Sequence, residues 1–224
     1  MGGHCQAGYW IDEGRRTTVP GLYAGGDVAG GAPYKFISGC WAEGVIAARS
    51  AVDDLGKLGT PPEIDQLQME AERERVMAPR QRFQEVREGV TPQEMEERLQ
   101  KLMDEYAGGV STFYEMNDER LEVARRRLKK LEGQVQYLIA GDPHQLLQAH
   151  ETLDRLLVAR AGVEHLLYRK ETRWPGYQTR LDYPERDDAK WLKFVNSVLD
   201  RDTGEVRILE RPYQQFVPGD RYKP

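Results

Sequence analysis

Apolar residues recur at intervals of three and four along the middle of the chain, which is the spacing of one face of an α-helix. In the segment that follows Asn117, these positions are Leu121, Ala124, Leu128, Leu131, Val135 and Leu138. They form a narrow apolar stripe on an otherwise charged segment. We therefore expect a helix that buries this stripe against its neighbours.

Helix start signals support two further helices. Thr91, Pro92 and Glu94 stand in the order of a capping box with proline at the first helical position, and Asp142 followed by proline repeats this pattern. The short link "IAGDP" favours an antiparallel arrangement of the helices on either side of it. Residues 59–172 are thus predicted to form a three-helix bundle, with proline and glycine at the helix boundaries.

The tail, residues 173–224, is aromatic and contains prolines, which is typical of loops. Within it, alternating apolar positions flank the turn-forming segment 200–204. We expect a β-hairpin there, with apolar positions on both strands: Phe194 and Val198 on the first, Val206 and Ile208 on the second.

The first region, residues 1–58, is rich in glycine and ends in the apolar helix "WAEGVIAARSAVDDL". Residues 19–24 read as a turn and a short buried strand that delivers Gly25-Gly26-Asp27, and ligands gather at the carboxyl ends of strands in open α/β sheets. Residues 38–40 then open the helix, whose N–H groups favour an anionic atom. An ordinary strand–loop–helix unit without a ligand fits the same pattern. Overall, the fold class is α+β.

Composition narrows the possible functions. The net charge of −5 and the pI near 5.5 argue against a general nucleic-acid binder. No run of 18 apolar residues and no secretory leader is visible. Cys5 and Cys40 make neither a disulfide framework nor a metal site, and the histidines of the bundle are not expected to be ligands. We expect reduced thiols, a cytoplasmic location and no metal in this chain.

Two separated motifs carry a family resemblance. "VPGLYAGGD" and "SGCWAEGVIAA" resemble the C-terminal part of the FAD-binding domain in flavoprotein subunits of the succinate dehydrogenase and fumarate reductase superfamily, and "MGGH" resembles the family's turn beside the flavin. Near the other end, "ETRWPGYQTRLDYPERDDAKW" is similar to the family's C-terminal pattern. The matching positions there are Glu171, Arg173, Arg180, Asp182, Pro184, Arg186, Asp187, Asp188 and Trp191.

One departure points to a subfamily. Members that act on succinate or fumarate carry a histidine and an arginine after the acid, whereas this chain has "VAGGAPYKFISGCWAEG", which contains neither. A dicarboxylate would lose its bidentate charge pairing there. This segment, together with "ETRWPGY", "FVNS" and "RPY", resembles the alpha subunits of adenylylsulfate (APS) reductases.

That resemblance implies an FAD-dependent reaction in which APS takes up two electrons to give AMP and sulfite, or the reverse. It also implies a ferredoxin-like iron–sulfur beta subunit as electron partner. No GxGxxG turn follows a strand here, so we expect the chain to start within a larger enzyme, with an upstream flavoprotein segment completing the FAD site. Alone, it should be inactive. Two alternatives are a fumarate reductase-like or succinate dehydrogenase-like fragment and a non-catalytic helical module for subunit assembly.

The resemblance also assigns site residues. The catalytic positions are His4 and Arg173, and the substrate-binding positions are Lys35, Trp174 and Arg180. The cofactor-binding positions are Gly3, Gly25, Gly26, Asp27, Ser38, Gly39 and Cys40.

Several of these residues also have a structural interpretation that does not involve a ligand. Arg173 and Arg180 are also consistent with a structural role, in which they pair with Glu171, Asp182 or Asp187. Trp174 is also consistent with an aromatic side chain packed against its neighbours. The basic run 125–130 is typical of a solvated helix face, and an acidic electron-transfer partner is the alternative.

Overall fold

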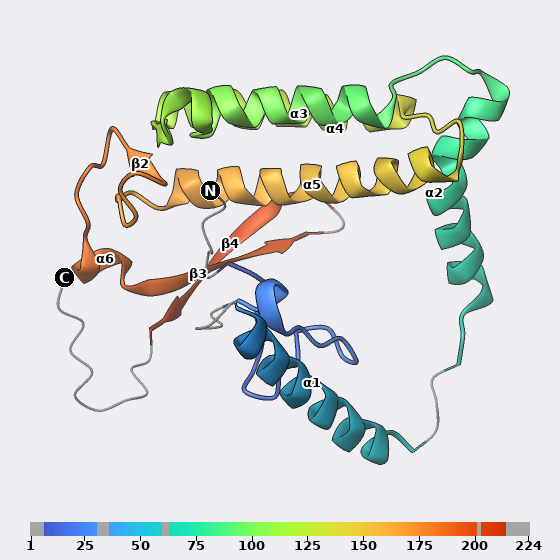
Figure 1. Ribbon diagram of the computed structural model, residues 1–224, viewed down its shortest axis with the longest axis horizontal. Helices are drawn as coiled ribbons and strands as arrows, with labels where there is room; N and C mark the ends of the chain where they lie inside the picture. The colour runs from blue at the N-terminus through green and yellow to red at the C-terminus, as the bar shows by residue number, and fades with distance from the viewer. Residues whose placement is uncertain (1–6, 31–35, 60–62, 201–202, 214–224) are drawn as a thin grey trace. The chain divides into compact units, whose positions relative to one another are not determined.

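The computed structural model describes residues 7–30, 36–59, 63–200 and 203–213 and divides the chain into two units, 1–65 and 66–224 (Figure 1). The first unit contains the 3-10 turn η1 (Gly26–Val28) and the helix α1 (Ile37–Leu58). The second contains the helices α2 (Gln66–Glu85), α3 (Pro92–Tyr106), α4 (Asp118–Glu132), α5 (Pro143–Tyr168) and α6 (Asp188–Trp191), and the 3-10 turns η2 (Val110–Thr112) and η3 (Val135–Tyr137). None of the described helices is long and apolar enough to cross a membrane.

In the first unit, the expected strand at residues 19–24 is reduced to an isolated bridge, between Arg16 and Tyr23. Gly21, with φ of +80°, turns the chain so that the Leu22 carbonyl accepts a hydrogen bond from Thr17 N at 2.9 Å. The pairing stays short because the opposing segment is itself only a few residues long. The helix also begins earlier than expected, so residues 38–40 lie within its first turn.

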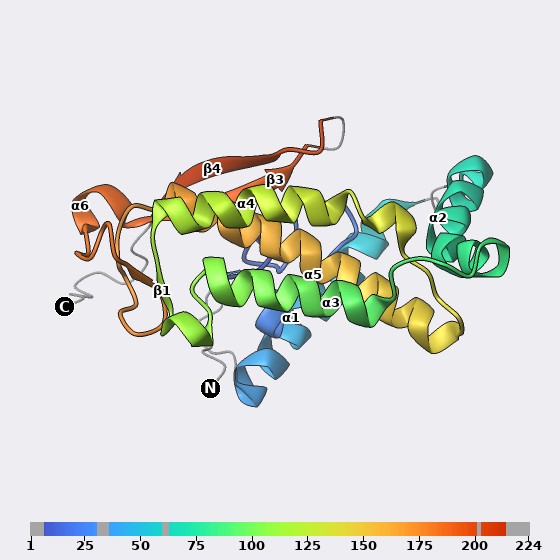
Figure 2. The same cartoon turned by 90° about the horizontal axis from the view of Figure 1, so that it is seen from above.

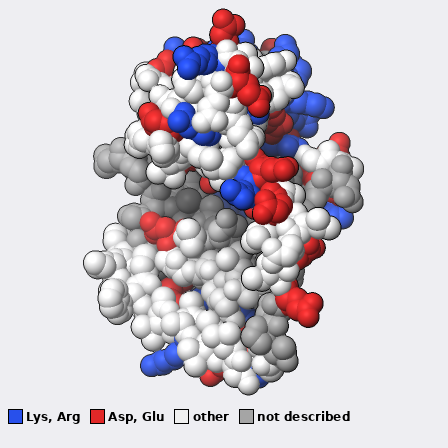
Figure 3. All heavy atoms as spheres, turned by 90° about the vertical axis from the view of Figure 1, so that its right-hand side faces the viewer, with Lys and Arg blue, Asp and Glu red and all other residues white. Residues whose placement is uncertain are grey.

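The predicted three-helix bundle is confirmed in the second unit. Figures 1 and 2 show α3 and α4 side by side, with α5 packed beneath both. Thr91 Oγ1 accepts from Glu94 N at 3.2 Å while the Glu94 carboxylate accepts from Thr91 N at 2.8 Å, which completes the capping box. Asn117 caps α4 and Asp142 caps α5 through their side-chain oxygens. Acidic and basic side chains are interspersed among uncharged residues over the face shown in Figure 3.

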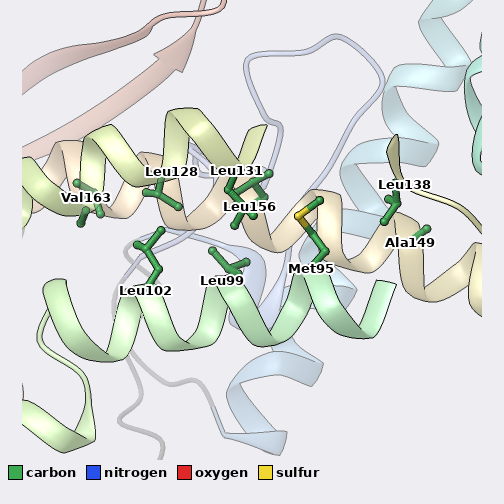
Figure 4. Close-up of a cluster of buried hydrophobic side chains, with 10 residues drawn as sticks. Met95, Leu99, Leu102, Leu128, Leu131, Leu138, Ala149, Leu156 and Val163 are labelled. Carbon is green, nitrogen blue, oxygen red and sulfur yellow. The ribbon is translucent and has the colours of Figure 1, made fainter. Parts of the chain in front are cut away.

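The inner faces of the bundle form the core. Figure 4 shows side chains from α3, α4 and α5 pointing toward one another, among them Met95, Leu99, Leu102, Leu128, Leu131, Leu156 and Val163. The apolar stripe was expected to lie on one helix through Leu138. Instead, α4 ends at Glu132, and Leu138 reaches the core from the segment that follows the 3-10 turn η3.

Pro79 contradicts the expectation that prolines mark boundaries, because it lies inside α2. A proline there removes one intrahelical hydrogen bond. Pro79 is nevertheless buried, and its carbonyl accepts from Ala140 N at 2.9 Å, so tertiary contacts hold the chain at this point.

Two small sheets complete the second unit. The expected hairpin is present as the antiparallel strands β3 (Lys193–Leu199) and β4 (Val206–Pro212). Its register pairs Leu199 with Val206 and Val198 with Arg207, so the apolar positions are not directly opposite one another throughout. The strands β1 (Glu115–Met116) and β2 (Thr179–Arg180) pair in parallel.

Candidate functional site

In the first unit, the segment Gly25-Gly26-Asp27 lies against the start of α1. Gly26 has φ of +72°, and a Cβ atom placed on it would stand 3.1 Å from the Cys40 sulfur. A Cβ atom on Gly25 would stand 3.2 Å from the backbone carbon of Glu43. Glycine is therefore required for this close approach of loop to helix. Asp27 is exposed at the end of the loop.

The first turn of α1 contains the other predicted cofactor residues, Ser38, Gly39 and Cys40. Ser38 is exposed, whereas Gly39 and Cys40 are half-buried. Phe36, the N-cap, provides no side-chain cap, and the turn carries no acidic residue. Within the cap and first turn, both features leave the positive end of the helix without a compensating side chain, which suits an anionic group.

Helix α1 packs in its unit through a polar face. Glu43 is buried and its Oε1 lies 3.2 Å from Arg15 Nη2. Farther along, Asp54 accepts hydrogen bonds from Arg16 and Tyr23, which hold the pKa of Asp54 well below its usual range. Reading the sequence for apolar periodicity missed this cluster. Its signal was a second stripe, Glu43, Ser50 and Asp54, at helical spacing on the opposite face.

Two atoms of this cluster, Glu43 Oε2 and Arg15 Nε, lack a partner within the described part of the chain. Glu43 Oε2 is buried and accepts no hydrogen bond there. Buried carboxylate oxygens are normally satisfied. Among the described residues, this buried ion pair therefore keeps one acceptor and one donor unpaired.

In the second unit, Arg173 belongs to an ion cluster centred on Glu171. The Glu171 carboxylate is fully buried and accepts from Arg173 Nε at 2.7 Å, Arg173 Nη2 at 3.0 Å and Arg169 Nη1 at 2.6 Å. Burial opposes ionisation of Glu171, but these donors outweigh it and lower its pKa. Arg173 Nη1 also lies 2.8 Å from Asp188. The guanidinium of Arg173 is thus held by the carboxylates of Glu171 and Asp188, which is consistent with a structural role for Arg173.

Arg180 is more completely engaged. Its side chain is 2% exposed and donates to the carbonyls of Leu166 and Arg169 and to the carboxylates of Asp118 and Asp182. These contacts use all five of its N–H groups. The geometry therefore favours a structural role for Arg180 and leaves no donor for a nucleotide.

Trp174 differs from both arginines because it is exposed. It stands at the start of a tight turn in which Gly176 has φ of +83° and Trp174 O accepts from Gln178 N at 2.9 Å. Tyr177 in the same turn is exposed as well. An exposed, backbone-fixed aromatic pair can stack on a planar ligand.

The predicted residues fall on two units, which are described separately. The first unit brings the loop 25–27 and the turn 38–40 together, and the second brings Arg173 to the Glu171 cluster. His4, Gly3 and Lys35 lie outside the described residues. No group of three or more His, Cys, Asp or Glu side chains in the described ranges is arranged to hold a metal ion.

Comparison with known proteins supports the two motifs. A family model described as "Fumarate reductase flavoprotein C-term" matches residues 96–221. The adenylylsulfate reductase alpha subunit of Megalodesulfovibrio gigas is 33% identical over 217 residues, which cover 92% of this chain and 32% of that protein.

Solved structures give the same grouping. Adenylylsulfate reductase from Archaeoglobus fulgidus superposes with a TM-score of 0.86 at 42% identity, over 90% of this chain and 33% of that chain. Quinol fumarate reductase of E. coli, at 22% identity and a TM-score of 0.73 over 95% of this chain and 37% of that chain, shares the fold. The chain spans about a third of the length of these relatives. The resemblance inferred from the sequence is confirmed, and the chain belongs to the family of fumarate reductase flavoprotein C-terminal domains.

Proposed function

We propose that this chain is the C-terminal portion of an FAD-dependent oxidoreductase of the adenylylsulfate reductase alpha type. The observation that carries this proposal is the 42% identity to the Archaeoglobus fulgidus reductase over 90% of the chain, against 22% to the E. coli fumarate reductase. The absence of a histidine and an arginine between Asp27 and Trp41 points the same way, since a dicarboxylate needs such a clamp.

The residues of the first unit fit a flavin. Gly25 and Gly26 allow the loop to pack closely against the start of α1. Asp27 is exposed, and its carboxylate would accept hydrogen bonds from ligand hydroxyls. The start of α1 offers N–H groups to an anionic edge of the ligand. The family resemblance assigns Gly3, which lies outside the described residues, to the cofactor as well. When bound, FAD supplies two-electron redox chemistry.

For the substrate, APS or AMP with sulfite, the roles rest on the family resemblance. His4 would act as a hydrogen-bond or charge partner of the sulfo group, and Lys35 would meet an anionic group. Trp174 is exposed and available to stack on a base. Arg173 would guide the nucleotide through N–H groups not used by Glu171 and Asp188. A ferredoxin-like iron–sulfur subunit would deliver the electrons, in the cytoplasm.

The exposed apolar face of helix α1 supports the proposal that another flavoprotein segment completes the unit. Its apolar stripe, formed by Ile37, Trp41, Val45, Val52 and Leu55, is exposed, with Ile37 86% and Trp41 76% accessible. Its polar face is the buried one. A helix normally buries its apolar stripe, so we infer that the FAD-binding part of the flavoprotein covers this stripe.

The test is complementation. The chain would be purified alone and co-expressed with the N-terminal two-thirds of the Archaeoglobus fulgidus alpha subunit, and bound flavin would be measured by its visible absorbance. We expect flavin only in the co-expressed complex, with Asp27→Ala lowering flavin content and the exposed Asp53→Ala leaving it unchanged.

Substrate class is then tested on the same complex. Reoxidation of the reduced flavin by APS, and not by fumarate, is the expected result. Stoichiometric flavin on the isolated chain would contradict the shared site. A complex without flavin would instead favour the assembly-module alternative.

A further inference from the structure

A basic groove of about 520 Å³ runs between α3 and α4 on the outside of the bundle, along the two helices that lie side by side in Figure 2. Four cations line this α3–α4 groove: Arg98 and Lys101 from α3, and Arg127 and Lys130 from α4. Glu105 is its one acidic lining residue. The groove therefore carries a local charge of +3 in a chain whose net charge is −5.

The four cations form no ion pair within 4.0 Å with any carboxylate of the described residues. Arg98 donates to the Gln134 side-chain oxygen at 2.6 Å, and the Arg127 guanidinium lies 4.6 Å from the centre of the Tyr106 ring. Both contacts hold the cations in place without neutralising them. Arg155 on α5 is paired with Glu96 at 2.9 Å, whereas the exposed Arg120 and Arg126 on α4 likewise form no ion pair with a carboxylate of the described residues.

The floor of the groove is apolar. Leu102 and Leu131 line it and are 7% and 5% exposed, so their visible surface lies between the charged rims. A cationic rim over an apolar floor matches a partner that presents carboxylates and apolar side chains together. A phosphate polyanion offers nothing to the floor, and a long one would meet the acidic remainder of the chain.

We propose that the α3–α4 groove docks an acidic, amphipathic polypeptide segment of a partner protein. Electrostatic attraction between the rim and the carboxylates speeds and orients the encounter, and the leucine floor holds apolar side chains. The proposal concerns the bundle alone and does not depend on flavin binding.

The test uses the full chain and two labelled peptides of about a dozen residues each, a length suited to one groove. One alternates glutamate with leucine and the other replaces each leucine by serine, so both carry the same charge. Binding is followed by fluorescence anisotropy at low salt. We expect the Glu/Leu peptide to bind at least about tenfold more tightly than the Glu/Ser peptide, and its affinity to fall as added salt screens the rim.

Charge reversal locates the site. The double variant Lys101→Glu/Lys130→Glu should weaken binding of the Glu/Leu peptide at least about tenfold, which is a loss of about 1.4 kcal/mol. The matched control, Arg126→Glu/Lys129→Glu, makes the same charge change on α4 outside this groove and should change the affinity by less than about twofold. All four side chains are exposed, so neither variant should unfold the bundle; circular dichroism checks this.

Three results would overturn the proposal. Equal losses in the two double variants would mean that net charge, and not the groove, attracts the peptide. Equal affinity for both peptides, or no binding, would remove the role of the apolar floor. Complete displacement of the Glu/Leu peptide by inorganic tripolyphosphate at an equal concentration would make the groove a phosphate site.

Discussion

Arg180 connects three parts of the second unit, and removing its side chain is our strongest prediction on stability. The guanidinium donates to two carbonyls at the end of α5, of Leu166 and Arg169, and to Asp118 in the first turn of α4. It also binds Asp182, with Nε and Nη2 each at 3.1 Å. A cation at one helix C-terminus and a carboxylate at the adjacent N-terminus complement both helix dipoles.

The magnitude follows from what Arg180→Ala leaves behind. The side chain of Arg180 is 2% exposed, whereas those of Asp118 and Asp182 are 37% and 27% exposed, so water can replace part of the lost bonding. An unsatisfied buried polar group costs about 1–3 kcal/mol, and breaking a buried ion pair about 3–5 kcal/mol. We expect a loss of about 3–4 kcal/mol, a large part of the roughly 5–15 kcal/mol of a typical domain.

The assay is urea unfolding of the full chain followed by far-ultraviolet circular dichroism. The matched control is Arg186→Ala, whose ion pair with Asp188 at 2.7 Å is partly exposed and should contribute at most about 1 kcal/mol. If Arg180→Ala does not fold, Arg180→Lys keeps the charge but loses at least two of the five donors, and should cost about 1–3 kcal/mol.

The pH dependence gives a second test. Burial opposes ionisation of Asp118, but the hydrogen bond from Lys170 and the charge of Arg180 outweigh it and lower its pKa from the ordinary value of 3.8. A carboxyl with a lowered folded pKa stabilises the fold above its unfolded pKa and loses that contribution as the pH falls through the folded pKa. The difference between wild type and Arg180→Ala should therefore shrink below about pH 4. A loss equal to that of Arg186→Ala, or one that does not change with pH, would refute the reasoning.

Three further predictions concern single contacts. Thr91→Ala removes one side of the capping box and should cost about 1 kcal/mol in urea unfolding, with an unchanged m-value. Gly26→Ala combines a positive φ with a contact of 3.1 Å to Cys40 and should cost about 1–2 kcal/mol; proteolysis within residues 1–65 should accelerate, and an unchanged cleavage rate would contradict the strained geometry. Trp41→Ser should change stability by less than about 0.5 kcal/mol because the side chain is 76% exposed, while binding of a hydrophobic dye falls.

The elements predicted best from the sequence are those fixed by local chemistry. The caps at Thr91, Asn117 and Asp142 place the starts of α3, α4 and α5 correctly because a capping side chain acts within its own first turn. The same local logic placed the turn of the hairpin. It failed at Pro79, which lies within α2 and is held by a tertiary contact with Ala140, far along the chain.

The site was harder to predict because its partners are distant in sequence. The motif around Arg180 suggested either a nucleotide contact or an ion pair, and no pattern in the sequence shows that Asp118 and Leu166 lie beside it. Burial decides between the two, and burial is a property of the fold. The contacts of Arg180 thus favour a structural role for this arginine of the motif, whereas Trp174 in the same motif is exposed.

Helix α1 is a second case in which the sequence alone does not predict which side chains are buried. Its apolar periodicity is plain in the sequence, and the usual inference would bury Trp41 and expose Glu43. In the first unit the reverse holds: Glu43 is buried with an unsatisfied oxygen, and Trp41 is exposed. Among the described residues, the apolar face then lacks a neighbour, and the buried ion pair of Glu43 and Arg15 keeps one acceptor and one donor unpaired. A flavoprotein segment that covers the stripe would complete the apolar face, and the complementation experiment tests this.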